Sequence, residues 1–217
     1  MLFRSVASQL IDSYVYGEQH PYGIMSAIPD IQAISIDSCR AFYKEHYQNG
    51  KCILFVSGNY PDSLMDLLEN LFGDLPINSS NIEVPKPNII PAKEKKYRIN
   101  NDPESVQGAI KLATPFPNRH DPDFKKVAVL NTVFGGYFGS RLMSNIREDK
   151  GYTYGIHSYL QNHLQQTAWM ISTDAGKDVS EATIEEVYKE MKKLREEPID
   201  EEELMLVRNY QIGRAHV

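Results

Sequence analysis

GSRLMSNIREDKGYTYG, residues 139–155, contains a small-residue turn, an amphipathic helical run and the beginning of a strand within seventeen positions. Its apolar residues recur at helical spacing, so one side of the run can face a core. Arg147 follows near the carbonyl end of the expected helix, and Tyr154 lies seven residues further on, in the expected strand. We therefore expect the two side chains to converge across a turn at Gly151.

Two interpretations of Arg147 and Tyr154 are open from the residues alone. A guanidinium fork and a tyrosine hydroxyl provide fixed hydrogen-bond donors that suit peptide carbonyls or carboxylates, with no proton chemistry required. In the structural alternative, Arg147 pairs with the helix C-terminus or with Asp149, and Tyr154 packs in the core. Residue chemistry alone favours the structural alternative.

Hydrophobic periodicity along the rest of the chain predicts a mixture of helices and neighbouring strands. The helix signals include Ser35 as an N-terminal cap, and Pro61 and Pro122 as residues of a first turn. The expected helices cover 1–17, 35–47, 61–73, 122–134, 140–149, 178–198 and 200–210, and the expected strands cover 51–60, 95–100, 105–116, 151–160 and 166–176.

Because the expected strands follow one another in pairs, the pattern indicates an α+β fold, a two-layer sandwich of a mostly antiparallel sheet with helices packed on one face. We expect residues 1–30 to form an N-terminal helix and connection, and residues 31–217 to form the main domain. Prolines and a small Asn/Ser cluster make residues 74–96 a linker or long surface crossing. The sequence ends inside an expected helix, so we expect truncation there.

Composition excludes some classes of function. The formal charge of −6 arises from 29 acidic and 23 basic residues without a long block of either sign, which argues against a nucleic-acid binder. No run approaches the roughly 18 apolar residues of a membrane span. Cys39 and Cys52 are expected to be buried free thiols, so cysteine usage leaves the compartment undecided.

The spacing of the histidines predicts no zinc site. Catalytic zinc needs three protein ligands, and many zinc peptidases place two histidines on adjacent helical turns beside a glutamate base. Residues 42–46, FYKEH, have the Glu-His end of an inverted His-x-x-Glu-His motif, but Phe42 stands at the first ligand position. His157 and His163 lie in an expected hairpin without an acidic partner, and we expect both to face solvent.

Nucleophilic and phosphate-binding motifs are also missing from the sequence. It contains no G-x-S-x-G elbow. The Gly-rich stretch FGGYFGS, residues 134–140, lacks the Lys-Ser/Thr pair of a P-loop and follows an expected helix. We interpret it as a tight connection between two helices that needs positive φ at its glycines.

GGYFGSRLMSNIREDKGYTYGI, residues 135–156, closely resembles the signature of the insulinase/pitrilysin superfamily of zinc metallopeptidases, which includes mitochondrial processing peptidase. HPYG, AFYKEHY with ILFVSGNY, LLENLFGDLP and IDEEELMLVRNY resemble further family landmarks in the expected order. The resemblance covers roughly Glu18 to Tyr210. It implies one of two homologous α+β halves that close round an unfolded peptide, with residues 1–30 coming from the preceding half.

The resemblance implies the non-catalytic, C-terminal type of half. Such a half lacks the zinc motif and supplies an Arg/Tyr pair that binds substrate, while zinc resides in the partner half. The pair corresponds to Arg147 and Tyr154, with Tyr152 as the competing position, and Arg141 is expected to be structural. The implied partners are a zinc-bearing half and a peptide substrate, and this chain alone is expected to be inactive. The alternative is a non-proteolytic scaffold subunit of the same fold.

Overall fold

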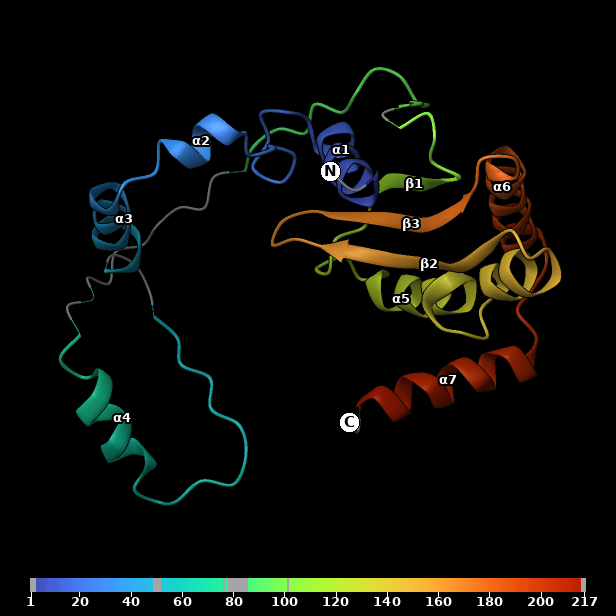
Figure 1. The fold of residues 1–217 in the computed structure, drawn as a ribbon. Helices are drawn as coiled ribbons and strands as arrows, with labels where there is room; N and C mark the ends of the chain where they lie inside the picture. Colours follow the sequence, from blue (N-terminus) through green and yellow to red (C-terminus); the bar gives the residue numbers. More distant parts are fainter. Residues whose placement is uncertain (1–2, 49–51, 76, 78–85, 101, 216–217) are drawn as a thin grey trace. The chain divides into compact units, whose positions relative to one another are not determined.

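The computed structural model describes residues 3–48, 52–75, 77, 86–100 and 102–215 (Figure 1). The chain divides into two compact units. The first, called the sheet unit, comprises Met1–Met25 and Pro87–Val217, and the second, called the insert unit, comprises Ser26–Lys86. Among the described residues, no helix combines the length and apolar character needed to cross a bilayer.

An antiparallel sheet organises the sheet unit. The strands β1 (Gln107–Phe116), β2 (Thr153–Asn162) and β3 (Thr167–Gly176) lie in the order β1-β3-β2, so β3 is central. These three strands confirm the predictions for 105–116, 151–160 and 166–176, and they confirm the α+β class. The strand predicted at 95–100 is wrong, because no strand is assigned to these residues.

Side chains alternate between the two faces of β3, and each face has its own apolar cluster. Ile171 and Trp169 belong to a larger cluster, whereas Ala168 and Met170 belong to a smaller cluster. The larger cluster is completed by helical residues, namely Phe134, Leu142, Met143, Ile146 and Val187. The smaller cluster is completed by Val15 and Tyr16.

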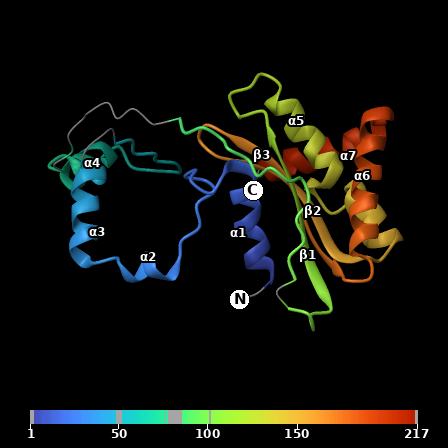
Figure 2. The same cartoon turned by 90° about the horizontal axis from the view of Figure 1, so that it is seen from above.

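Most helical elements of the sheet unit therefore cover one face of the sheet, as Figure 2 shows. They are α5 (Phe124–Asn131), the π-helical turns η2 (Thr132–Gly136) and η3 (Met143–Asp149), α6 (Ser180–Glu196) and α7 (Glu201–Ala215). Helix α1 (Phe3–Tyr16) lies on the opposite face and adds a layer that the sequence pattern did not predict.

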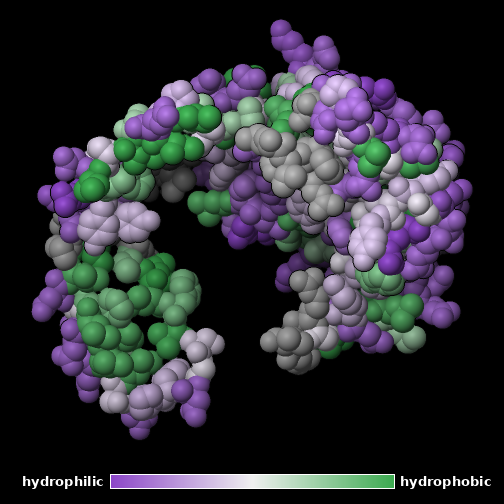
Figure 3. Space-filling model, in the orientation of Figure 1, coloured by the Kyte–Doolittle hydropathy of each residue, from purple (hydrophilic) through white to green (hydrophobic). Residues whose placement is uncertain are grey.

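The insert unit consists of short helices joined by irregular segments. They are α2 (Ile28–Gln32), α3 (Ile36–Phe42), its π-helical continuation η1 (Tyr43–Tyr47) and α4 (Leu64–Phe72). Ser35 caps α3 as predicted, since its Oγ accepts a hydrogen bond from the Ser38 N–H at 3.0 Å. Apolar side chains gather over α4 and the segment before it (Figure 3), and none of the described residues of this unit is buried.

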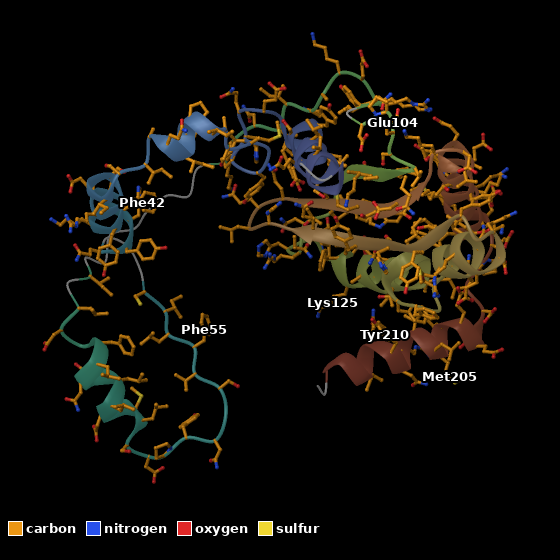
Figure 4. The ribbon with its side chains drawn as sticks, viewed as in Figure 1. Phe42, Phe55, Glu104, Lys125, Met205 and Tyr210 are labelled. Carbon is orange, nitrogen blue, oxygen red and sulfur yellow. The ribbon has the colours of Figure 1, made fainter. Side chains whose placement is uncertain are left out.

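Two predictions in the insert unit are wrong. The described part of the expected buried strand, residues 52–60, has no strand structure, and the Phe55 side chain is 91% exposed (Figure 4). Cys39 and Cys52, expected to be buried, are both exposed. A strand requires a neighbour to pair its backbone groups, and a thiol is buried only where a core surrounds it. The described residues of the insert unit provide neither a paired strand nor a buried core.

Candidate functional site

The site predicted at residues 139–155 begins where η2 passes close to strand β2. A Cβ atom added at Gly135 would lie 2.6 Å from the Ser158 Cβ and 2.8 Å from the Ser158 backbone nitrogen. Gly135 is therefore required by close packing. The predicted reason, a positive φ in this connection, is wrong, because the described glycines with positive φ are Gly17, Gly58 and Gly151.

Tyr137 separates η2 from the next helix, and its extended backbone sends its own ring and that of Phe138 in opposite directions. Tyr137 has φ −151° and ψ 173°, and its ring packs 5.1 Å from that of Tyr210, which projects from α7 (Figure 4). The following residue, Phe138, is 62% exposed. Successive side chains of extended backbone point in opposite directions, which explains why one ring is packed and the next is not.

Arg141 holds this helical segment to α7. Its Nε and Nη2 atoms donate to Glu203 Oε1 and Oε2 at 2.8 and 2.7 Å, a bidentate ion pair with both side chains mostly shielded from solvent. Hydrogen bonding to Glu203 raises the pKa of Arg141 above the ordinary value of an arginine. The guanidinium is thus already engaged within the fold, as the structural assignment of Arg141 predicts.

Arg147 has a different environment from Arg141. Its side chain is 29% exposed, and its Nη1 atom lies 3.6 Å from Glu148 Oε1, whereas the structural alternative had named Asp149 as its partner. The guanidinium carbon lies 4.6 Å from the ring centroid of Phe138 and 5.9 Å from that of Tyr154. Both distances fall within the range of a cation–π interaction. The structure thus brings Arg147 and Tyr154 close together across the turn.

The turn between Arg147 and Tyr154 depends on a glycine. Gly151 has φ +65°, in the left-handed region that favours glycine. The Tyr152 N–H then donates to the Ile146 carbonyl at 3.0 Å, and the Tyr152 side chain packs against the larger apolar cluster. Of the two tyrosines proposed as companions of Arg147, Tyr152 thus has its ring packed against the core.

Tyr154 lies in a β-bulge. Thr153 pairs with Ala175, and Ile156 pairs with Thr173. Between these two pairs, β2 therefore contains one residue more than β3. The extra residue leaves the Tyr154 side chain 92% exposed, between the buried residues Thr153 and Ile156. Tyr154 does not pack in the core as the structural alternative expected.

Hydroxyl groups beneath the bulge fix its geometry. Thr153 Oγ1 donates to the Asp174 carbonyl at 2.6 Å and accepts from Thr173 Oγ1 at 2.8 Å. The Gly155 N–H also donates to Thr153 Oγ1, at 3.1 Å. Because both threonines are buried, these bonds hold the backbone on either side of Tyr154.

Helix α6 braces the other side of η3. Asn145 Nδ2 donates to Glu186 Oε2 at 3.1 Å and to Glu190 Oε1 at 2.7 Å. Both carboxylates are buried and each also pairs with a lysine of α6, at 2.7 Å. The hydrogen bond from Lys189 lowers the pKa of Glu186, so this carboxylate stays charged and anchors Asn145 two residues before Arg147.

Sequence reasoning did not single out Phe138 or Asn145. Phe138 stands between Gly136 and Gly139 in a connection too short to reach a core, and an isolated aromatic residue in such a turn is a usable signal of a surface role. Asn145 gave no local signal, since its partners lie more than forty positions away on α6.

No metal centre is formed by the part of the chain that the structure describes: no three or more His, Cys, Asp or Glu side chains are placed to share an ion. Phe42, at the expected ligand position, packs its ring 4.4 Å from that of His46. His157 is exposed as expected. His163 is not, because its imidazole stacks on Tyr22 at 3.9 Å and is partly buried.

Comparison with known proteins gives consistent matches. The chain is 24% identical over 200 residues to the uncharacterized zinc protease YmxG of Bacillus subtilis (strain 168), and 29% identical over 199 residues to an uncharacterized zinc protease of Rickettsia felis. These matches cover 92% and 89% of this chain but 48% and 46% of the relatives. The chain thus spans about half the length of the curated relatives it matches.

A solved structure supports the same fold. The peptidase M16 inactive domain from Pseudomonas fluorescens matches with a TM-score of 0.75 at 24% identity, covering 98% of this chain and 51% of that chain. Residues 33–210 match the family model of the peptidase M16 inactive domain, which confirms the resemblance to the zinc metallopeptidases of the insulinase/pitrilysin superfamily. This chain belongs to the peptidase M16 inactive-domain family.

Proposed function

We propose that this domain is the non-catalytic, substrate-binding half of a zinc-dependent endopeptidase that processes peptides inside a closed chamber. The observation that carries the proposal is the pair formed by Arg147 and Tyr154. A partly exposed guanidinium lies 5.9 Å from the ring of a tyrosine whose side chain is 92% exposed. A pair with only a structural role would not need its tyrosine at the surface.

The role of each residue follows from its chemistry. The guanidinium of Arg147 offers charged donors in a plane, and the hydroxyl of Tyr154 offers one neutral donor. Together they bind backbone oxygens of the peptide, or stabilise the oxyanion that develops on a carbonyl under attack. The Tyr152 ring packs against the apolar cluster, which favours Tyr154 as the companion.

The partner in this proposal is a homologous half that carries zinc, in the same polypeptide or in a separate subunit. Zinc would supply an activated water and polarise the scissile carbonyl. Strand β2 lies at one edge of the described sheet, where an extended peptide can add by main-chain hydrogen bonding. The family match begins at residue 33, which supports residues 1–30 as the connection from a preceding half.

The test is reconstitution with the zinc-bearing half and an internally quenched fluorogenic peptide. We expect no cleavage by this domain alone. In the reconstituted enzyme, Arg147→Ala should lower kcat/KM by about 10- to 100-fold, because hydrogen bonds to charged groups contribute about 1.5–3 kcal/mol. Tyr154→Phe should give a smaller loss, while Tyr152→Phe should change little.

Arg195→Ala on the exposed surface of α6 is the matched control, since it removes one exposed arginine that is not part of the proposed pair. Unchanged kcat/KM in Arg147→Ala would refute the binding role. Absence of cleavage by the unmodified domain together with the zinc-bearing half would instead favour the alternative, a non-proteolytic scaffold subunit.

A further inference from the structure

Phe138 has a position that the core does not explain. A phenylalanine with 62% of its surface exposed exposes apolar area to water without gaining burial energy. The residues around it are packed within the fold, since the Tyr137 ring contacts that of Tyr210 and the Ser140 side chain is fully buried. What the Phe138 ring contacts is the guanidinium of Arg147, at 4.6 Å from the ring centroid to Cζ.

The two rings around Arg147 come from different elements. Phe138 precedes η3, and Tyr154 lies in the bulge of β2. The turn that contains Phe138 is closed by the Ser140 N–H, which donates to the Tyr137 carbonyl at 3.2 Å, and the backbone beside Tyr154 is held by the buried threonine hydroxyls. The guanidinium is therefore held by groups that do not move with the Arg147 side chain.

Aromatic contact affects which part of the guanidinium is free. A ring over the plane of the cation leaves the N–H groups, which lie in that plane, able to donate. Glu148 is the competing partner, and at 3.6 Å its carboxylate is beyond hydrogen-bond distance. The guanidinium thus contacts the Phe138 ring and makes no hydrogen bond to Glu148, which leaves its N–H groups available to a ligand.

We propose that Phe138 is a positioning residue of the peptide-binding site, whose ring holds the Arg147 guanidinium so that its N–H edge meets an oxygen acceptor of the bound peptide. This inference rests on the proposed function of Arg147. Phe138 acts through Arg147, and its contribution comes from the aromatic face of the ring. Apolar volume alone does not replace it.

The chemistry of the ring is tested by two substitutions in the complete enzyme, with this domain and the zinc-bearing half together. Phe138→Leu keeps apolar volume and removes the aromatic face, so it should lower kcat/KM for the fluorogenic peptide by about two- to fivefold. Phe138→Trp restores a better cation–π surface and should retain native kcat/KM. Tyr188→Leu, at an exposed aromatic residue of α6, is the matched control and should have no effect.

A double-mutant cycle separates an effect through Arg147 from a direct one. In an Arg147→Ala background, Phe138→Leu should cause no further loss. An equal loss in both backgrounds would overturn the proposal, because Phe138 would then act independently of the cation. Native kcat/KM in Phe138→Leu would also overturn it.

A spectroscopic readout does not depend on activity. The ring current of Phe138 should shift the Arg147 side-chain Nε–H signal in the NMR spectrum, and this shift should be lost in Phe138→Leu and kept in Phe138→Trp. An unchanged signal in Phe138→Leu contradicts the contact. If Arg147→Ala lowers kcat/KM and Phe138→Leu does not, only this inference fails. If Arg147→Ala has no effect, the proposed function fails.

Discussion

At the scale of single residues, two arginines of one helical segment show how environment separates a structural role from a proposed binding role. Arg141 is bound at both ends of its fork by Glu203, whereas Arg147 meets aromatic rings and a carboxylate 3.6 Å away. A guanidinium saturated by a bidentate partner has little to offer a ligand. Side-chain chemistry alone makes the two residues equivalent; the family resemblance separates them in the sequence, and their neighbours separate them in the structure.

Gly135 leads to a prediction about stability at the same scale. Gly135→Ala should destabilise the protein by about 1–3 kcal/mol, because the new methyl group would overlap Ser158 and the Leu142 side chain in a packed interior. Gly213→Ala is the matched control, since nothing lies within 4 Å of its added Cβ in helix α7. It should stabilise the protein by about 0.5–1 kcal/mol.

Urea unfolding followed by fluorescence measures both variants. Trp169 is the single tryptophan of the chain, and its Nε1–H donates to Asn131 Oδ1 at 2.9 Å, beside the larger cluster. Equal stability of Gly135→Ala and the unmodified protein would mean that η2 can move away from β2 at little cost.

At the scale of elements, the docking of α1 depends on buried polar and aromatic side chains. Tyr16 and His20 are buried, and Tyr22 stacks on His163 beyond the end of β2. Burial raises the pKa of Tyr16 to about 12. Burial also lowers the pKa of His163, with the nearby Asp12 carboxylate opposing the effect. The contact between α1 and the β2–β3 hairpin is therefore sensitive to protonation.

Protonation of His163 disfavours the folded state. The folded-state pKa of His163 lies below its ordinary value of 6.5, so the folded state prefers the neutral imidazole. That stabilisation is fully present above pH 6.5 and is lost as the pH falls through the folded-state pKa. We expect His163→Gln to flatten the decrease in unfolding free energy between about pH 7.5 and pH 5.5.

Asp12 has the opposite sign, because burial raises its pKa and its contribution is lost as the pH rises. The change in slope caused by the substitution is therefore the relevant measurement. His157→Gln, at an exposed position of β2, is the control and should keep the native slope. The same slope in His163→Gln would show that α1 docks independently of this imidazole.

Elements with strong local patterns were predicted well. The three strands of the sheet, α6 and the Ser35 cap of α3 follow from alternation, periodicity and capping chemistry. The segment 52–60 was predicted wrongly. Its apolar run has the composition of a strand, but a strand forms only with a pairing partner, which composition does not reveal.

The candidate site was partly accessible to prediction in the same way. The turn at Gly151 and the proximity of Arg147 to Tyr154 follow from spacing. The bulge that exposes Tyr154 does not, because it depends on the register with β3. The placement of Phe138 over Arg147 is a tertiary contact between residues nine positions apart, and no periodicity predicts it.

At the scale of the whole molecule, burial is unequal between the two units. The described residues with buried side chains all belong to the sheet unit, from Ser13 to Val207. The described part of the insert unit has none. Since burial of apolar area drives folding, the sheet unit contains the elements needed for cooperative stability.

This distribution predicts the outcome of a deletion. Replacing residues 26–86 by a flexible Gly/Ser linker of about 20 residues should leave the sheet unit folded, with cooperative urea unfolding reported by Trp169. Residues 26–86 expressed alone should lack a cooperative transition by circular dichroism. Loss of the Trp169 transition in the deletion variant would show that the sheet unit needs the insert unit to fold.

The bulge in β2 makes the proposed binding surface depend on chain length as well as on residue identity. Thr153 and Ile156 both face the interior, although residues three apart in a regular strand point to opposite sides. The extra residue of the bulge allows both side chains to face inward and leaves Tyr154 in solvent beside Arg147. In evolutionary terms, a substitution at Gly155 preserves this arrangement, whereas insertion or deletion of one residue between Gly151 and Ile156 changes which side chains face out. The length of this segment is therefore a criterion for separating relatives that keep the arginine–tyrosine pair from relatives that have lost it.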